Sequence, residues 1–161
     1  MNMPKIELIT SIRSTPEICF DLSRSIDLHQ ISTAKTNEKA IAGTITDLIN
    51  LGETVTWEAT HFGITQKLTS KITAFKRPFH FRDEQVKGAF SSFTHDHFFE
   101  QQNDMVIMKD IFDFISPLGI AGNIFNKLIL TKYLTKFLND RNNVIKAYAE
   151  SEKWKSIIPQ H

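Results

Sequence analysis

Residues 116–152 read SPLGIAGNIFNKLILTKYLTKFLNDRNNVIKAYAESE, and this stretch decides how the rest of the chain is organised. Its opening Ser116-Pro117 is typical of the point where a strand ends and a helix begins. The residues after this dipeptide predict one helix of roughly 35 residues, three times the typical ~11–12. Most of the chain before it alternates as β-strands do. Because so long a helix must bury its apolar face, we expect a sheet to wrap around it.

A helical wheel divides this segment at about Leu130. C-terminal to Leu130, apolar and polar residues occupy opposite faces of the helix. The apolar face holds Leu130, Tyr133, Leu134, Phe137, Leu138, Val144, Ile145 and Tyr148. The front half, Ile120 to Ile129, is apolar on nearly all sides and is loosened by Gly119 and Gly122. We expect the back half to seal a core, and the front half to act as a ligand gate or a partner contact.

Two short helices are predicted after a first strand at Lys5–Ile12. Ser14-Thr15-Pro16-Glu17 supplies a capping hydroxyl and a first-turn proline, which open a helix that ends near Ser25. The second helix is predicted over Asp27 to Ala34, with Asp27 itself as the cap.

Six further strands are predicted between these helices and the long one. They are Ala40–Asn50, Thr54–Phe62, Thr65–Phe75, Phe79–Val86, Ser91–Gln101 and Met105–Ile115. The breaks between them carry Gly, Pro or Asn-Asp turn residues. None of these connections is long enough for a parallel crossover, so we expect an antiparallel meander. With the first strand, this predicts an α+β fold with a curved seven-stranded sheet.

Length and composition limit the class of protein. The 161 residues fit one domain covering 1–161, with a formal net charge of +1 that gives no reason to expect a nucleic-acid partner. Thirteen Phe residues suit either a core or the wall of an apolar cavity. Cys19 is the single cysteine, so no internal disulfide can form, and we expect it to be a small buried side chain. The sequence contains no membrane-spanning run, and we predict a cytoplasmic protein.

The predicted order of elements resembles the helix-grip fold of the START-like superfamily, also known as the polyketide cyclase/dehydrase and lipid-transport or SRPBCC superfamily, to which the plant pollen allergens belong. Three segments are similar to bacterial stand-alone members: TVTWEATHFG (54–63), MKDIFDF (108–114) and SPLG (116–119). The resemblance covers almost the whole chain. It implies a hydrophobic cavity between sheet and helix, but none of these segments is a catalytic signature. Such folds host carriers, sensors and enzymes alike.

Strand alternation places aromatic and histidine side chains together on two predicted strands. One face carries Val55, Trp57, Ala59 and His61, and another carries Phe93, His95, His97 and Phe99. If Asn103-Asp104 is a two-residue hairpin turn, His97 lies opposite Asp110, and Asp110 shares a face with Phe112. We predict that these faces line the cavity.

The polar members of this set, His61, His95, His97 and Asp110, allow several interpretations. A histidine polarised by a carboxylate could act as a general acid or base, and His95-x-His97 could ligate a metal. Alternatively, the histidines hydrogen-bond one another, a ligand or water, or they face solvent. Since no third ligand is evident, we predict no metal site and no cofactor. No catalytic residue is assigned.

Arg141 lies within the apolar stripe of the long helix. Buried there, it would need a ligand carboxylate or an aspartate of the sheet as its partner. Alternatively, it extends along the helix edge to water. Asp83-Glu84 together with Lys76-Arg77 is predicted to be a solvated charged turn region. The predicted ligand-binding residues are Trp57, His61, Phe93, His95, His97, Asp110, Phe112, Tyr133, Phe137 and Arg141.

The sequence leaves three functions open. The first is binding of a small hydrophobic molecule, lipid-like or polyketide-like, between the sheet and the long helix. The second is an enzyme of the cyclase or dehydrase kind that uses the histidines and Asp110. The third is a protein-interaction module, for example a homodimer, formed through the apolar front half of the helix.

Overall fold

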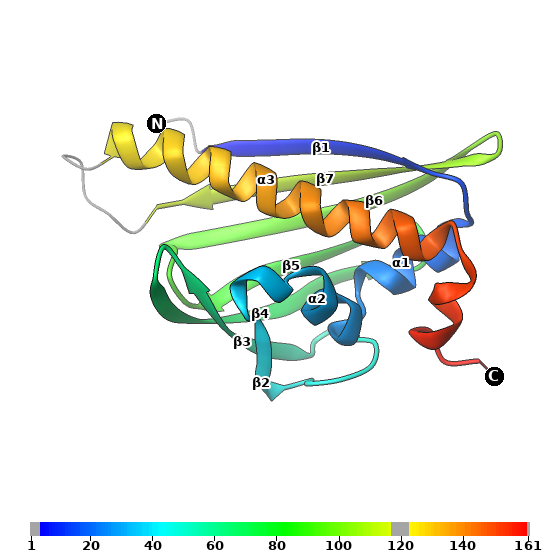
Figure 1. Cartoon of the computed structure of the whole chain (residues 1–161), viewed down its shortest axis with the longest axis horizontal. Helices are drawn as coiled ribbons and strands as arrows, with labels where there is room; N and C mark the ends of the chain where they lie inside the picture. Colours follow the sequence, from blue (N-terminus) through cyan, green and yellow to red (C-terminus); the bar gives the residue numbers. More distant parts are fainter. Residues whose placement is uncertain (1–3, 117–122, 161) are drawn as a thin grey trace.

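The computed structural model describes residues 4–116 and 123–160, and its main feature is an antiparallel sheet curved around a long helix (Figure 1). The seven strands are β1 (Lys5–Ile12), β2 (Lys39–Gly43), β3 (Thr54–His61), β4 (Ile64–Lys76), β5 (His80–Lys87), β6 (Ser92–Gln102) and β7 (Met105–Ile115). They pair in the order β1-β7-β6-β5-β4-β3-β2, so β2 to β7 form a meander and β1 pairs with β7. The predicted α+β helix-grip fold is confirmed.

The helices are α1 (Pro16–Ser23), α2 (Ile26–Ser32) and α3 (Asn123–Ala149), with short 3-10 turns η1 (Ala34–Thr36) and η3 (Glu152–Ser156). The predicted capping hydroxyl of α1 is that of Thr15, which accepts from the backbone N–H of Ile18. The predicted cap of the second helix is wrong. Ser25 caps α2 by accepting a hydrogen bond from the backbone N–H of Leu28 at 3.1 Å. Asp27 instead accepts from the backbone N–H of Asp47 at 2.8 Å, which fixes the following loop.

The long helix ends earlier than predicted. Helix α3 stops at Ala149, and the 3-10 turn η3 follows it. Ser116 lies outside the helix, directly after β7. The predicted first turns at 117–122 lie outside the described residues, as do the side chains of 123–126. Over the rest of α3, the burial of the side chains agrees with the predicted helical wheel. Leu134, Leu138 and Ile145 are buried.

The predicted strand over Ala40–Asn50 is too long, since β2 ends at Gly43. Gly43 has φ +75°, and a Cβ there would collide with the carbonyl oxygen of Thr54, so the chain turns out of the sheet at this glycine. The loop after Gly43 sends Ile49 into the core, where its backbone N–H donates to the carbonyl of Arg24.

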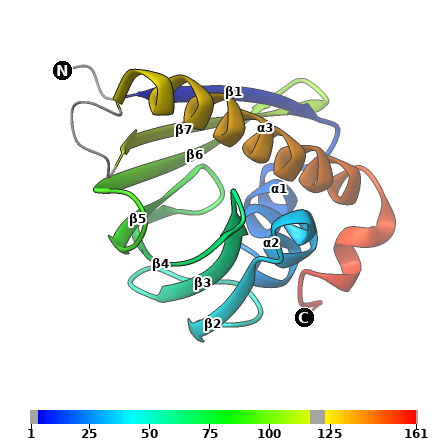
Figure 2. The ribbon, with the colours of Figure 1, turned by 60° about the vertical axis from the view of Figure 1, so that its left-hand side comes forward.

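Figure 2 shows α3 crossing the concave side of the sheet while α1 and α2 close one end. The apolar core accordingly has two parts. One, around Phe20, Met108 and Ile145, lies where α1 meets the sheet and the back half of α3. The other, around Phe112 and Leu134, lies under the middle of α3. The space between sheet and helix that is not filled by these two clusters is the candidate site.

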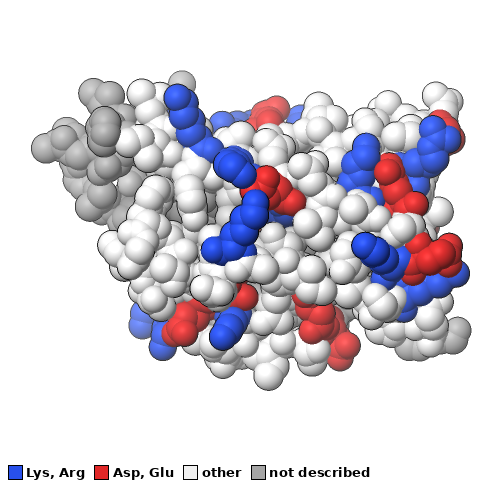
Figure 3. All heavy atoms as spheres, in the orientation of Figure 1, with Lys and Arg blue, Asp and Glu red and all other residues white. Residues whose placement is uncertain are grey.

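Charged side chains of both signs lie next to one another over the face shown in Figure 3. Among the described residues, none of the helices is both long and apolar enough to cross a membrane.

Candidate ligand cavity and buried polar cluster

A cavity of about 440 Å³ lies between the sheet and α3. Its wall is mostly aromatic and aliphatic, with contributions from α2, the strands β3 to β7, and α3. Nine of the ten predicted ligand-binding residues line it. The exception is Asp110, which is fully buried directly behind the wall and is hydrogen-bonded to His95.

The cavity reaches the surface beside the front of α3. Phe62 and Ile129 line it, although their exposed fractions are 61% and 41%. The Phe62 ring packs on Tyr133 with 4.6 Å between ring centroids, and the Tyr133 hydroxyl lies 2.6 Å from Nδ1 of His61. Burial lowers the pKa of His61. The opening of the cavity is therefore lined by aromatic side chains and by the imidazole of His61, whose neutral form is favoured by burial.

Asp110 is the centre of a buried polar cluster in the cavity wall. β6 places His95 and His97 on one face, and β7 places Asp110 opposite His97, as predicted from the hairpin turn. The Asp110 Oδ1 atom lies 2.8 Å from His95 Nε2 and 3.1 Å from His97 Nδ1, although His97 Nδ1 lacks hydrogen-bond geometry. Asn142 on α3 donates from Nδ2 to Asp110 Oδ2 at 2.7 Å. The cluster therefore ties the sheet to the helix.

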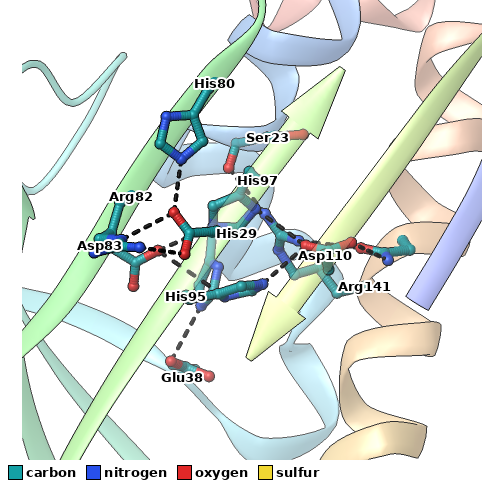
Figure 4. A network of polar contacts seen from close by, with 12 residues as sticks. Ser23, His29, Glu38, His80, Arg82, Asp83, His95, His97, Asp110 and Arg141 are labelled. Carbon is teal, nitrogen blue, oxygen red and sulfur yellow. Dashed lines mark hydrogen bonds and ion pairs between the residues drawn. The ribbon is translucent and has the colours of Figure 1, made fainter. Parts of the chain in front are cut away.

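Asp83 faces the same two imidazoles from β5. Its Oδ1 atom lies 2.9 Å from His97 Nε2 and 3.9 Å from His95 Nδ1. Figure 4 shows both rings between Asp83 on one side and Asp110 on the other. The predicted strand at Phe79–Val86 does contain Asp83, but the prediction that Asp83 is part of a solvated turn region is wrong, since only 19% of its side chain is exposed. Its i+2 relation to the buried Phe81 was the signal that could have found it.

Arg141 completes the cluster from α3. Only 4% of the residue is exposed, so the alternative in which it extends to water is wrong. Its guanidinium donates to the carbonyl of Ser23 at 3.0 Å and to Asn142 Oδ1 at 3.1 Å, and lies 3.6 Å from Asp110 Oδ1. An aspartate of the sheet is thus one of its partners.

The two neighbouring imidazoles differ in their proton affinity. Burial alone would lower the pKa of His97, but the carboxylates of Asp110 and Asp83 outweigh it and raise that pKa. Burial and the neighbouring His97 together lower the pKa of His95. For Asp110, burial acts to raise the pKa, but the two imidazoles hold it well below its usual value. Of the two imidazoles, His97 therefore has the higher proton affinity.

A second polar pair in the cavity wall was not predicted. His29 Nε2 lies 3.1 Å from Glu38 Oε1, and the His29 ring lies over Trp57 with 4.3 Å between centroids. The other oxygen, Glu38 Oε2, is buried without a hydrogen-bond partner among the described residues. His29 lies on α2 and Glu38 lies between η1 and β2, so strand alternation marks the face of neither residue.

This arrangement can hold the apolar body of a molecule and hydrogen-bond its polar end. The imidazoles and carboxylates are also groups that transfer protons. Within the described part of the chain, Asp83, His95 and His97 offer metal-ligand atoms that lie within 4.8 Å of one another.

The sequence matches no protein-family model and no curated protein. Solved structures do match along nearly the whole chain. An aromatase/cyclase from Streptomyces sp. R1128 gives a TM-score of 0.73 at 10% identity, covering 92% of this chain and 94% of its own. Major latex-like protein 151 from Panax ginseng gives 0.67 at 16% identity, covering 92% and 99%. A START superfamily protein from Mycobacterium smegmatis gives 0.68 at 8% identity, covering 91% and 97%. The chain has the fold of these START-like proteins.

Proposed function

We propose that the protein binds a small hydrophobic molecule, lipid-like or polyketide-like in its skeleton, between the sheet and α3. The observation that carries this proposal is the cavity of about 440 Å³, apolar over most of its wall and polar around His97. Small-molecule sites typically have ~300–1,000 Å³ and a few convergent polar groups in an apolar lining. The apolar skeleton would lie against Trp57, Phe93 and Phe112, with its polar end toward the cluster.

The size of the cavity argues against an incidental packing defect. Protein interiors contain few voids larger than a water molecule. At ~24 cal/mol per Å³, a dry void of 440 Å³ would cost roughly 10 kcal/mol, which is comparable to the whole stability of a typical domain. We therefore infer that solvent or a ligand fills this space when the protein is at work.

The structural neighbours support the same proposal. Their names include an aromatase/cyclase and a START superfamily protein. Fold likeness at this identity does not transfer a ligand, so the argument rests on the cavity itself.

The proposal can be tested by filling the cavity. Ala59 on β3 is buried and lines it, so Ala59→Phe should occupy ligand space. Binding would be followed with cis-parinaric acid as a lipid-like probe and a flavonoid as a polyketide-like probe. We expect saturable binding of at least one probe to the natural protein, and a loss of about tenfold or more, ~1.4 kcal/mol, in the variant.

Thr60→Phe is the matched control, since Thr60 neighbours Ala59 but points to the other face of β3. It should bind as the natural protein does. If Ala59→Phe does not fold, the smaller Ala59→Leu replaces it. Failure of both probes to bind, together with no copurifying molecule in native mass spectrometry, would count against the proposal.

Acid–base catalysis is the second candidate function, favoured by the position of His97 between Asp83 and Asp110 at the cavity wall. In that case His97→Gln should abolish cyclisation of a poly-β-ketone model substrate while probe binding persists. Turnover that is unaffected by the substitution would exclude His97 as the acid or base.

A further inference from the structure

The side of the polar cluster that faces the cavity presents three potential metal ligands. We propose that Asp83, His95 and His97 bind a divalent first-row transition-metal ion. This inference goes beyond ligand binding and does not depend on it. The sequence alone predicts no metal site, because no third ligand is evident there beside His95 and His97.

The donor atoms are of suitable type and are already close together. Asp83 Oδ1 lies 2.9 Å from His97 Nε2 and 3.9 Å from His95 Nδ1, and the three donors lie within 4.8 Å of one another. With metal–ligand bonds of ~2.0–2.2 Å, donors on one ion lie about 3.0–3.5 Å apart. The separations of 2.9 and 3.9 Å lie just below and just above that range. Two imidazoles and one carboxylate suit Zn²⁺, Fe²⁺ or Co²⁺ better than Ca²⁺ or Mg²⁺.

The residues behind these donors support the same interpretation. Metal-binding histidines usually direct their second ring nitrogen at a carboxylate, which fixes the tautomer and the ring orientation. Here His95 Nε2 and His97 Nδ1 both face Asp110 Oδ1, at 2.8 and 3.1 Å. The other oxygen of Asp110 is held by Asn142. Asp110 therefore holds His95 by a hydrogen bond and lies beside the ring nitrogen of His97 that faces away from Asp83.

The charge of the cluster also favours a cation. Asp83 and Asp110 contribute two negative charges and Arg141 one positive charge, so with neutral imidazoles the cluster carries −1. Buried charges need compensation in a medium of low dielectric constant. A divalent ion supplies it without requiring a proton on either ring.

The proposed ion would be accessible from the cavity, since all three ligands line it. A site with three protein ligands leaves coordination positions for water or a substrate oxygen. The ion would thereby favour cavity ligands that carry a carboxylate, phenolate or hydroxyl group near one end.

The experiment is a metal titration of the full chain, prepared without a polyhistidine tag and treated with a chelator. Isothermal titration calorimetry with Zn²⁺ and the visible absorption of the Co²⁺ complex are the two readouts. We expect one ion per chain, bound with a tetrahedral or five-coordinate Co²⁺ spectrum. His95→Ala and Asp83→Asn should each lower the affinity by more than the ~10–100-fold typical of second-sphere changes.

His80→Ala is the matched control, because His80 is a half-buried histidine paired with Asp96 and lies outside the cavity wall. It should bind the ion as the natural protein does. Asp83→Asn keeps the side-chain shape, so it tests the site even if His95→Ala fails to fold. No stoichiometric binding would overturn the proposal, and so would binding that is equally tight in Asp83→Asn.

Discussion

At the scale of single residues, Asp110 supports the most contacts in the buried polar cluster. It faces His95, His97, Asn142 and Arg141, and it is fully buried. Removing one member of a buried charged network leaves its partners uncompensated, which typically costs ~3–5 kcal/mol. We expect Asp110→Ala to lower the free energy of unfolding by about that amount in urea denaturation.

Asp113→Ala is the control on the same strand, since Asp113 is only half-buried and lies on the opposite face of β7. It should cost less than about 1 kcal/mol. Equal losses for the two variants would show that the Asp110 contacts do not stabilise the fold.

Asp21 gives a prediction for the dependence of stability on pH. Burial acts to raise the pKa of Asp21, but hydrogen bonds from Arg77 and Arg24 outweigh it and lower the pKa below 3.8. The folded protein thus binds this proton less readily than the unfolded chain, so the carboxylate stabilises the fold above the unfolded pKa. That contribution is lost as the pH falls below 3.8 and through the folded pKa.

The measurement is urea denaturation of the natural protein and of Asp21→Asn between neutral and acidic pH. The difference in unfolding free energy should be constant near neutrality and should shrink below about pH 4. A difference that grows on acidification would contradict the ion-pair assignment.

The sequence identified part of the site because periodicity carries information about faces. His95, His97 and Asp110 could be placed together since a two-residue turn fixes the register of a hairpin. Alternation with the buried Phe81 gives the face of Asp83, but its place opposite His95 depends on the pairing of β5 with β6, which the connection at 88–91 does not fix as a two-residue turn does. Glu38 lies between η1 and β2, so alternation does not determine its position.

At the scale of elements, α3 divides into a part that lines the cavity and a part that packs in the core. Ile129 to Arg141 supply its contacts with the cavity, whereas Ile145 and Ala149 belong to the closed core beside α1. Leu128, near the front of α3, is exposed, so the prediction of a partner contact there can still be tested.

We expect ligand binding to slow hydrogen exchange in the cavity-facing part of α3 only. With cis-parinaric acid bound, amides between Leu130 and Leu138 should exchange more slowly, because opening this segment would expose the ligand. Amides between Ile145 and Ala149 should change little. Exchange mass spectrometry that finds protection only at the back of α3 would place the ligand elsewhere.

Element boundaries could be predicted where a local signal marked them. Pro16 and the Asn103-Asp104 turn set the start of α1 and the β6–β7 hairpin. The early end of β2 could not be anticipated, because it depends on how closely Gly43 approaches Thr54 in the folded sheet. Contacts between segments that are distant in sequence decide such positions.

At the scale of the whole molecule, the sheet is curved enough to leave space under α3 rather than a filled core. A cavity wall and a packed core have the same sequence pattern, since both need inward-facing apolar residues. The volume of about 440 Å³ emerges only when the strands, α2 and α3 are assembled. The central claim of the proposed function is that a small hydrophobic molecule occupies this volume.

Fluorescence quenching by brominated ligands tests this claim most directly, because bromine quenches tryptophan only at close approach. The chain has two tryptophans: Trp57 lines the cavity, and Trp154 lies in η3 outside its wall. Dibromostearic acid and a bromoflavone would be titrated into Trp154→Phe and Trp57→Phe. We expect saturable one-to-one quenching by at least one ligand when only Trp57 remains, and weak quenching when only Trp154 remains. No saturable quenching of Trp57 by either ligand would contradict the proposed binding site.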